Sequence, residues 1–449
     1  MNGQKVLVLG LAKSGYEAAK LLVKRGASVT VTDRNIPTDT RHIDELQELG
    51  VHITLGSHPF TLLDGLDFIV KNPGIPYTIP FLQEAIKRNI RVITEVELAY
   101  IISKAEIIGI TGSNGKTTTT MLTHALLQHS VKTPLLAGNI GHVACQVVQE
   151  ASEQDVVVTE LSSFQLMGID TFKPKVSIFL NLSNAHLDYH GDFDQYKAAK
   201  ARLFENQTPE DVLIYNADDF HVSEVAKKAV ARTIPFSQEK KLENGIYLED
   251  KHVMYQNQKL FTIDEVALPG THNLENVMAA AACALVYGVS IDHIRFVVQT
   301  FTGVKHRLQY VDTIQGVMFY NNSKSTNSIS TRKAIEAFQQ PLILLAGGLD
   351  RKDDFHELRP VLSRVKACFL YGETASVLAN VCREEGVTVV EMTPTLSEAT
   401  SKAISFASSG DVVLLSPACA SWDQYQTFEH RGDDFLACIQ EFTNQSNLI

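Results

Sequence analysis

A short glycine-containing segment carries the clearest chemistry in this sequence. It reads IIGITGSNGKTTTT over residues 107–120 and places Lys116 and Thr117 directly after a Gly-rich turn. Residues 107–110 predict a strand, and apolar residues at helical spacing after Lys116 predict a helix. Backbone N–H groups of such a turn point at phosphate oxygens, the lysine adds positive charge, and the threonine hydroxyl suits Mg²⁺. The segment therefore predicts a nucleoside triphosphate site, in a variant with Ile110 where the usual pattern has its first glycine.

A second phosphate-binding pattern stands at the start of the chain. Residues 5–9 predict a strand, the residues after it read GLAKSG, and Asp33 follows a second predicted strand at 28–32. A Gly-rich turn between a strand and a helix, with an acidic residue about twenty positions later, is close to the dinucleotide-binding fingerprint. Taken alone, this pattern predicts a nicotinamide or flavin cofactor. Together with the nucleotide loop at 112–117, it predicts a ligand that contains phosphate and ribose.

Apolar runs that end in polar clusters recur along the chain, and they predict the strands that position these residues. Continuous Val, Ile and Leu runs are typical of a parallel sheet, whose ligands collect at the carboxyl ends of the strands. Residues 232–268 differ, because short strands with Gly and Asn turns predict a small antiparallel insertion. The other predicted strands are 67–71, 90–94, 155–159, 176–182, 211–215, 317–320, 341–346 and 411–415, and the predicted helices include 194–206 and 273–286.

The length and the recurring pattern predict an α/β protein of three consecutive domains. A chain of 449 residues is longer than a single hydrophobic core supports. We expect a Rossmann-like domain at 1–97, a central P-loop domain with a parallel sheet at 98–302, and a second Rossmann-like domain at 303–449.

The composition argues against several functional classes. The net charge is −11 and the basic residues are scattered, which argues against nucleic acid as a partner. No apolar run reaches the length of about 18 residues that a membrane-spanning helix needs. The first residues are typical of a strand rather than of a leader, so we expect a cytoplasmic protein without membrane insertion. Six cysteines without metal-ligand spacing are expected to be reduced and mostly buried.

Seven segments together resemble the Mur ligase family, and the resemblance covers nearly the whole chain. The segments are ITGSNGKTT (110–118), ELSSFQL (160–166), HLD (186–188), HNLEN (272–276), KHR (305–307), NSKSTN (322–327) and SPACASWDQY (416–425). The resemblance implies the three-domain fold and an ATP-dependent ligase of peptidoglycan synthesis, which adds D-glutamate to UDP-N-acetylmuramoyl-L-alanine through an acyl phosphate. This chemistry needs triphosphate, metal, carboxylate and amine held together in a site that excludes water. It depends more on positioned cations than on a protein group that forms a covalent intermediate.

The same resemblance implies which residues act on ATP. The implied ATP contacts are Gly112, Ser113, Asn114, Gly115, Lys116, Thr117, Thr118, Asn273, Asn276, Arg307, Asn322 and Asp350. The implied catalytic residues are Lys116, Glu160, His186, Lys200 and Lys324. Asn322 departs from the family pattern, which usually has Asp at this position, so a neutral amide would face the ribose.

A pair of Mg²⁺ ions is implied as well. The implied protein ligands are Thr117, Glu160, His186 and Lys200, the last as a carbamate formed with CO₂. Hard cations prefer carboxylate oxygens, which suits Glu160, with an ordinary strand-end acid as the alternative. His186 either ligates metal or orients the incoming amine. A carbamate would turn Lys200 from a cation into a carboxylate-like ligand.

Two further groups of residues are implied for the substrates, and the enzyme is expected to be a monomer. The implied contacts to the UDP precursor are Lys13, Ser14, Asp33, Arg34, Asn72, Gly74 and Asn139. The implied contacts to D-glutamate are His186, Lys324, Thr326, Lys352, Ser421 and Phe428. For Phe428, a purely structural role remains an equal alternative.

Three other functions stay open at this point. The first predicted βαβ unit alone favours an NAD-dependent oxidoreductase, and the nucleotide loop alone fits a switch or motor that uses ATP for conformational work. Within the same superfamily, another Mur-type ligase or a folylpolyglutamate synthetase-like ligase would share most of these segments.

Overall fold

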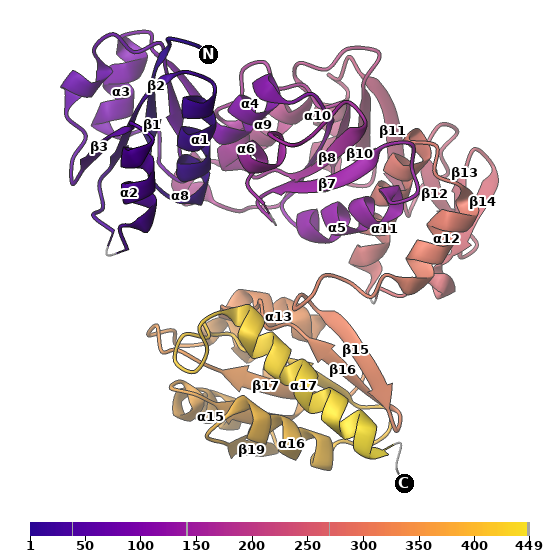
Figure 1. Ribbon diagram of the computed structural model, residues 1–449. Helices are drawn as coiled ribbons and strands as arrows, with labels where there is room; N and C mark the ends of the chain where they lie inside the picture. Colours follow the sequence, from indigo (N-terminus) through magenta and orange to yellow (C-terminus); the bar gives the residue numbers. More distant parts are fainter. Residues whose placement is uncertain (38, 141, 269, 447–449) are drawn as a thin grey trace. The chain divides into compact units, whose positions relative to one another are not determined.

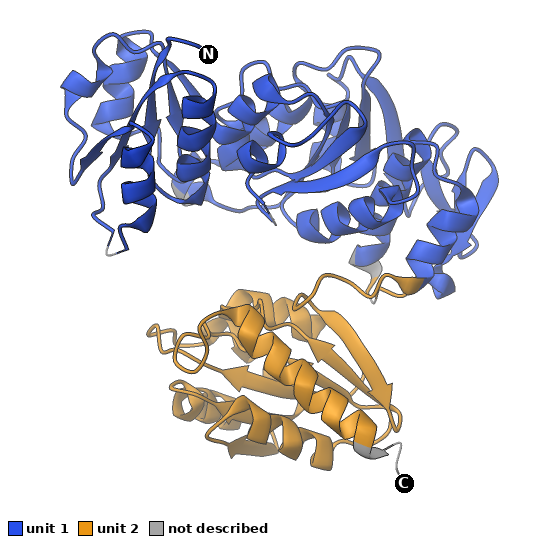
Figure 2. Ribbon diagram, in the orientation of Figure 1, with its two compact units in different colours: residues 1–265, 272–299 blue, residues 266–271, 300–449 orange. Residues whose placement is uncertain are grey.

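Three β-sheets, each flanked by helices, make up the structure, as the predicted α/β class requires (Figure 1). The computed structural model describes residues 1–37, 39–140, 142–268 and 270–446. By contacts, the chain divides into two units, which comprise residues 1–265 and 272–299, and residues 266–271 and 300–449 (Figure 2). Unit 1 contains the first two sheets and unit 2 contains the third.

The first sheet has five parallel strands in the order β3-β2-β1-β4-β5. Its core strand β1 is buried from Val6 to Leu9, as its continuous apolar run predicts. A Cβ on Gly15 would lie 1.9 Å from the carbonyl oxygen of Gly10, so only glycine lets helix α1 start this close to β1. The elements are β1 (Lys5–Leu9), α1 (Lys13–Lys24), β2 (Ser28–Asp33), α2 (Arg41–Glu48), β3 (His52–Leu55), β4 (Phe68–Lys71), α3 (Pro80–Lys87) and β5 (Arg91–Thr94).

The second sheet has nine strands in the order β14-β13-β12-β11-β10-β9-β6-β8-β7. The segment 232–268 is not a separate antiparallel insertion. Its first two strands, β11 and β12, pair in parallel and extend the main sheet, and only β13 and β14 are antiparallel. The strands are β6 (Glu106–Thr111), β7 (Thr133–Gly138), β8 (Asp155–Glu160), β9 (Val176–Phe179), β10 (Val212–Asn216), β11 (Arg232–Ser237), β12 (Ile246–Glu249), β13 (His252–Tyr255) and β14 (Gln258–Thr262).

Helices cover this sheet and carry six of the predicted site residues, namely Lys116, Thr117, Thr118, Lys200, Asn273 and Asn276. Helix α9 ends at Ala201, earlier than predicted, and residues 202–204 continue as a short 3-10 turn. The helices are α5 (Lys116–Leu127), α6 (Ala144–Val147), α7 (Ser163–Leu166), α8 (Leu187–His190), α9 (Phe193–Ala201), α10 (Phe220–Ala226), α11 (Thr271–Val286) and α12 (Ile291–Thr300).

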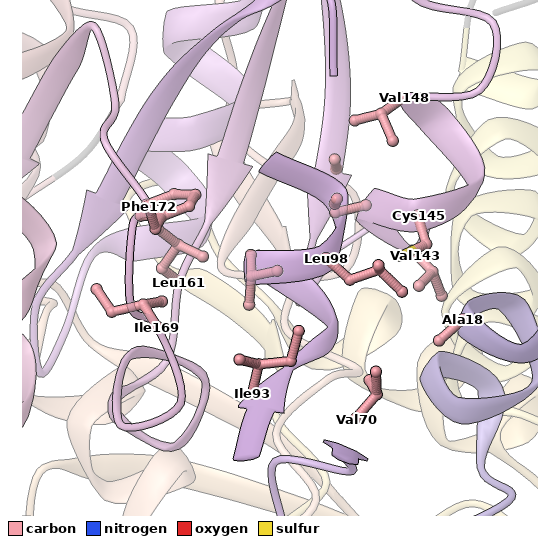
Figure 3. Packing of buried hydrophobic residues seen from close by; sticks show 14 of the residues in the cluster. Ala18, Val70, Ile93, Leu98, Val143, Cys145, Val148, Leu161, Ile169 and Phe172 are labelled. Atoms are coloured by element: carbon pink, nitrogen blue, oxygen red, sulfur yellow. The ribbon is translucent and has the colours of Figure 1, made fainter. Parts of the chain in front are cut away.

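The first two sheets share one hydrophobic core at helix α4 (Glu95–Ile102). Figure 3 shows Ile93 and Leu98 among side chains of both domains, including Ala18 of the first and Cys145 of the second. The buried carboxylate of Glu97 accepts backbone N–H bonds from residues 170–172 at 2.8–3.0 Å. Helix α4 therefore joins the two domains, and it runs across the expected boundary at 97/98.

The third sheet has six strands in the order β15-β16-β20-β17-β18-β19, and only the β15–β16 pair is antiparallel. Apolar side chains fill both of its faces. The elements are β15 (Gln309–Ile314), β16 (Val317–Asn321), α13 (Ser328–Glu336), β17 (Leu342–Gly347), α14 (Arg359–Leu362), β18 (Val365–Tyr371), α15 (Ala375–Glu384), β19 (Val389–Met392), α16 (Leu396–Phe406), β20 (Val412–Leu415) and α17 (Phe428–Ser446).

Two expectations from composition can be compared with the structure. The six cysteines are free thiols and five of them are buried, as predicted. In the part of the chain that the structure describes, no helix has both the length and the apolar character needed to cross a membrane.

Candidate active site

The predicted strand–turn–helix around the phosphate loop is confirmed. Strand β6 leads into the turn 112–115, and α5 starts at Lys116 after Gly115, which has a φ of 80°. A Cβ on Gly115 would lie 2.2 Å from Oδ1 of Asn276, so only glycine allows this close approach. The turn is also fixed from the end of β9, because Asn181 Oδ1 accepts the Asn114 N–H at 2.8 Å. The turn that would bind phosphate is thus held on two sides.

The cation and the hydroxyl of the loop lie where the predicted chemistry needs them. The Lys116 ammonium donates to the carbonyl oxygens of Gly112 and Ser113 at 2.9 and 3.1 Å, within the loop itself. The Thr117 hydroxyl donates to Oε2 of Glu160 at 2.7 Å. Glu160 ends β8 and is buried, so strand β8 sets its carboxylate beside the first turn of α5.

A carboxylate next to a threonine hydroxyl at a phosphate loop is a donor set that suits Mg²⁺. The amide of Asn139, which is predicted to contact the UDP precursor, donates to Oε1 of Glu160 at 2.9 Å. In the described ranges, no group of three or more His, Cys, Asp or Glu side chains gathers as a ready metal site. The predicted set differs from such a group, because it includes the Thr117 hydroxyl and a modified Lys200.

Lys200 is a buried amine close to the phosphate loop. Its Nζ donates to the Gly112 carbonyl oxygen at 2.8 Å and to the Thr111 hydroxyl at 3.2 Å, and it lies 5.0 Å from the centre of the Tyr196 ring. Burial, together with the positive charge of Lys116, lowers the pKa of Lys200 well below its usual value. The lowered pKa makes the neutral form of this amine, which is the nucleophilic form, more accessible than in an exposed lysine.

His186 lies on the loop before α8, near the same residues. It has a φ of 55°, and its ring centre lies 5.0 Å from that of Phe164 and 6.4 Å from that of Tyr196. The loop is tied to the phosphate turn, because Ser113 Oγ is 3.0 Å from the Tyr196 hydroxyl and accepts the Ser183 N–H at 2.9 Å. Phosphate turn, His186 loop and α9 therefore form one hydrogen-bonded group.

The two asparagines of α11 contact the phosphate helix. Asn276 accepts the Thr119 hydroxyl at 3.1 Å and donates to Asn273 at 3.1 Å, and both asparagines are buried. Thr118 lies half-buried between these groups along α5. The structure thus brings the unit 1 residues predicted for ATP to one end of the central sheet.

A cavity of about 620 Å³ lies at the carboxyl ends of the strands of the first sheet. Four of the residues predicted for the UDP precursor line it, namely Asp33, Arg34, Asn72 and Gly74. Asp33 accepts the backbone N–H of Leu11 at 2.6 Å. This carboxylate therefore holds the turn before α1.

The other residues predicted for this cavity contribute differently. Ser14 accepts a hydrogen bond from the Asn72 amide at 3.2 Å, and Lys13 is exposed at the start of α1. Sequence reasoning missed the aromatic wall of the cavity, which is formed by His58, Phe60 and Phe81. The signal for two of these was the segment SHPF at 57–60, a polar turn with an aromatic residue directly after a strand.

In unit 2, the residues predicted for D-glutamate lie around the ends of β16 and β20. The Lys324 ammonium lies 3.9 Å from the centre of the Phe428 ring. The Ser323 hydroxyl donates to the Phe428 carbonyl at 2.7 Å, and the buried Arg431 guanidinium donates to Ser323 Oγ and to its carbonyl at 3.0 and 2.8 Å. Arg431, which the sequence patterns did not single out, therefore holds the Lys324 loop against α17.

The remaining unit 2 residues have partners within the unit. The Asn322 amide donates to Ser416 at 3.1 Å and accepts the Leu308 N–H at 3.0 Å. Lys352 forms an ion pair with Asp350 at 2.7 Å, which holds the pKa of the Asp350 carboxyl below its usual value. The other predicted residues differ in exposure, with Ser421 buried, Thr326 half-buried and Arg307 exposed.

Comparison with known proteins identifies relatives over the whole length. Three family models match: "Mur ligase MurD-like, N-terminal domain" at residues 4–94, "Mur ligase middle domain" at 110–284, and "Mur ligase, glutamate ligase domain" at 306–419. The chain is 50% identical over 441 residues to the UDP-N-acetylmuramoylalanine–D-glutamate ligases of Bacillus cereus (strain G9842) and Bacillus mycoides (strain KBAB4). Each match covers 98% of both chains.

Solved structures share the fold at low sequence identity. The UDP-N-acetylmuramate-alanine ligase of Thermotoga maritima matches with a TM-score of 0.58 and 18% identity, covering 97% of this chain and 99% of that one. The MurF ligase of Thermotoga maritima, solved in complex with ADP, matches with a TM-score of 0.54 and 16% identity, covering 98% and 95%.

Proposed function

The chain belongs to the Mur ligase family, and on this basis we propose that it joins D-glutamate to UDP-N-acetylmuramoyl-L-alanine with ATP in peptidoglycan synthesis. One observation carries the proposal: a single unit holds both a triphosphate loop and a separate 620 Å³ cavity lined by polar loop residues, on two sheets with a common core. Because the first domain matches a Mur ligase domain, the fingerprint at Gly10 belongs to a ligase and not to an oxidoreductase.

The reaction needs the carboxylate of the UDP precursor to become an acceptor for an amine. An oxygen of that carboxylate attacks the γ-phosphorus of ATP, and ADP leaves with the electrons of the broken P–O bond. The amine of D-glutamate then attacks the acyl carbon, loses a proton and displaces phosphate. Transfer of this kind depends on positioning and on cations, which is the role we assign to Lys116 in the turn.

We assign Mg²⁺ to Thr117 and Glu160, with His186 and a carbamate on Lys200 completing the donors for a pair of ions. When bound, the metal supplies positive charge that stabilises the transferred phosphoryl group. The Asn139 amide orients the Glu160 carboxylate, and His186 either joins the donors or orients the amine.

The carbamate is assigned on the family resemblance, and the burial of Lys200 supports it. The neutral amine attacks CO₂, an N–C bond forms, and a proton leaves, so that a negative group stands near Lys116 in place of the neutral amine. The lowered pKa of Lys200 supports this step, because only the unprotonated amine reacts with CO₂.

The remaining assignments rest on the same family membership. We place the nucleotide of the UDP precursor in the cavity of Asp33, Arg34, Asn72 and Gly74. D-Glutamate is assigned to Lys324, Thr326, Lys352, Ser421 and Phe428, and the rest of ATP to Asn273, Asn276, Arg307, Asn322 and Asp350. We further propose a cytoplasmic monomer with functional domains at 1–97, 98–302 and 303–449.

Phosphate release tests this function directly. The chain is given ATP, UDP-N-acetylmuramoyl-L-alanine and a panel of D- and L-amino acids, and release is expected to require both co-substrates and to prefer D-glutamate. With ¹⁸O in the precursor carboxylate, the label is expected in the released phosphate. Release without either co-substrate would favour an ATP-driven switch, and preference for another amino acid would indicate a different ligase of the superfamily.

A further inference from the structure

Lys71, at the end of β4, is a buried lysine outside the predicted site. Its side chain is fully buried, and its Nζ donates to the carbonyl oxygens of Ile75, Pro73 and Asn72 at 2.7, 3.0 and 3.2 Å. Burial lowers the pKa of Lys71 to about 7. An ammonium has three protons to donate, and three carbonyls of this turn lie within hydrogen-bond distance of them. Lys71 therefore acts on the turn 72–75, and it is not among the residues that line the cavity.

The same turn is contacted from the central domain. The Tyr189 hydroxyl, on α8, lies 3.0 Å from the Ile75 carbonyl oxygen, 3.1 Å from that of Pro73 and 3.4 Å from Nζ of Lys71. Its ring packs on Phe164, with ring centres 4.6 Å apart. Phe164 is also the ring against which His186 packs. The turn of the first domain is thus tied to the helix that directly follows His186.

The turn also forms part of the cavity wall. Asn72, Gly74 and Ile75 all line the 620 Å³ cavity. Turn 72–75 therefore has the cavity on one side and the pair Lys71–Tyr189 on the other. Burying an ammonium is costly unless its protons are hydrogen-bonded. Here Nζ faces the turn carbonyls, the Tyr189 hydroxyl and the Tyr77 ring, whose centre is 4.7 Å away.

We propose that Lys71 and Tyr189 are positioning residues that fix the turn 72–75 against α8. A UDP precursor in the cavity is thereby held at a fixed position relative to the His186 loop. This inference rests on the proposed function. Neither side chain is a catalytic residue, because both act through the carbonyl oxygens of the turn.

Lys71→Met and Tyr189→Phe test the proposal in the full chain. We expect Lys71→Met to weaken the binding of UDP, measured by equilibrium titration, and to raise KM for the UDP precursor, each by about tenfold, because buried carbonyls lose their donors. KM for ATP is expected to stay unchanged. Tyr189→Phe should raise KM for the precursor by about threefold and lower kcat, because the link to α8 is lost. The double variant should be little weaker than Lys71→Met alone, because both side chains share the same acceptors.

Lys24→Met is the matched control. Lys24 ends α1 and donates to Gln149 at 3.3 Å, so it also connects the two domains of unit 1, but away from turn 72–75. We expect this variant to have wild-type values for UDP binding, for both KM values and for kcat.

The outcomes separate the inference from the proposed function. The positioning role would be overturned if Lys71→Met left UDP affinity unchanged, or if it weakened the binding of UDP and of ATP equally. In either case the ligase function would stand as long as the wild type turns over its substrates. If Lys71→Met does not fold, Tyr189→Phe decides, and unchanged kinetics there would overturn the proposal. A wild-type protein that releases no phosphate in response to the UDP precursor would overturn both.

Discussion

Two lysines of unit 1 are buried, and the surroundings of each decide its chemistry. Lys71 contacts backbone carbonyl oxygens, and this suits a hydrogen-bond donor that stabilises a turn. Lys200 lies beside the phosphate loop and near a second cation, Lys116, which disfavours its protonated form. The same type of side chain thus supports a turn in one place, and in the other we propose that it reacts as an amine.

Replacement of Lys200 tests the second role. Lys200→Ala is expected to lower kcat by about a hundredfold or more, because a donor for the metal at a preorganised site is lost. Short carboxylates such as formate or acetate should restore part of the rate by standing in for the carbamate. The measurement is phosphate release with and without added carboxylate.

Lys197→Ala serves as the control for this experiment. Lys197 lies on the same helix, α9, and pairs with Asp194 at 2.6 Å, near the surface. Its replacement should leave kcat near wild type, with no response to carboxylates. Full activity of Lys200→Ala would exclude the carbamate.

Glu95 predicts a pH dependence of stability. It lies buried in the first turn of α4, accepts the Cys145 N–H, and burial raises the pKa of Glu95 to about 7. The folded state then holds this proton more tightly than the unfolded state, so this group makes the protein less stable as pH rises from about 4.5 to 7. The loss should reach about 3 kcal/mol at most.

Glu95→Gln isolates this contribution. Gln keeps an oxygen that can accept the Cys145 N–H but has no proton to lose. The free energy of unfolding of the wild type and of Glu95→Gln would be measured by urea denaturation at pH 5 and at pH 7.5. The value for the wild type minus that for the variant should be smaller at pH 7.5 than at pH 5. A constant difference would contradict the assignment.

At the scale of elements, glycine positions set how closely the phosphate loop approaches α11. Gly115→Ala would place a Cβ 2.2 Å from Asn276 Oδ1, in addition to the strain of a φ of 80°. We expect kcat/KM for ATP to fall by about a hundredfold, because the turn must shift by a sizeable fraction of an ångström. Steady-state kinetics at varied ATP would measure this.

Gly288→Ala is the comparison for that variant. Gly288 also has a positive φ, of 72°, but a Cβ there would meet nothing within 4 Å. It should cost about 1 kcal/mol of stability and leave kcat/KM for ATP unchanged. Equal kinetic effects of both variants would mean that backbone strain, and not the approach to Asn276, is what matters.

The elements also explain what the sequence could and could not predict. Buried strands such as β1, β8 and β20 have continuous apolar runs, and their predicted positions are confirmed to within a residue or two. Strands β3, β7, β15, β18 and β19 were missed. All except β18 lie at the edge of their sheet, where half-exposed positions or a proline interrupt the apolar run. Strand β18 is internal, and Lys366 interrupts its apolar run near the start.

Site residues follow a similar rule. Residues inside contiguous motifs, such as Thr117 and Glu160, were predicted and lie together. Lys71 and Arg431 were not, because a lone basic residue has no sequence signal for burial. Their roles depend on carbonyl oxygens from distant segments, which only the folded chain brings near.

At the scale of the whole molecule, the hydrophobic cores predict two unfolding transitions. One core runs through both domains of unit 1, and separate cores lie in unit 2. Calorimetry should therefore show two transitions instead of three. UDP at about one hundred times its Kd should stabilise the transition of unit 1, which holds the cavity, by about 2.7 kcal/mol. The transition of unit 2 should stay unchanged. A single transition, or a shift of both, would contradict this.

The shared core at α4 has a consequence for ligand design. Because Ile93 and Leu98 pack into one apolar interior with the second domain, the cavity of the first domain and the phosphate loop belong to one compact unit with a shared core. A bivalent ligand with a rigid linker of matching length would bind the cavity and the phosphate loop together, with little additional loss of conformational entropy. A flexible linker would lose much of this gain in affinity.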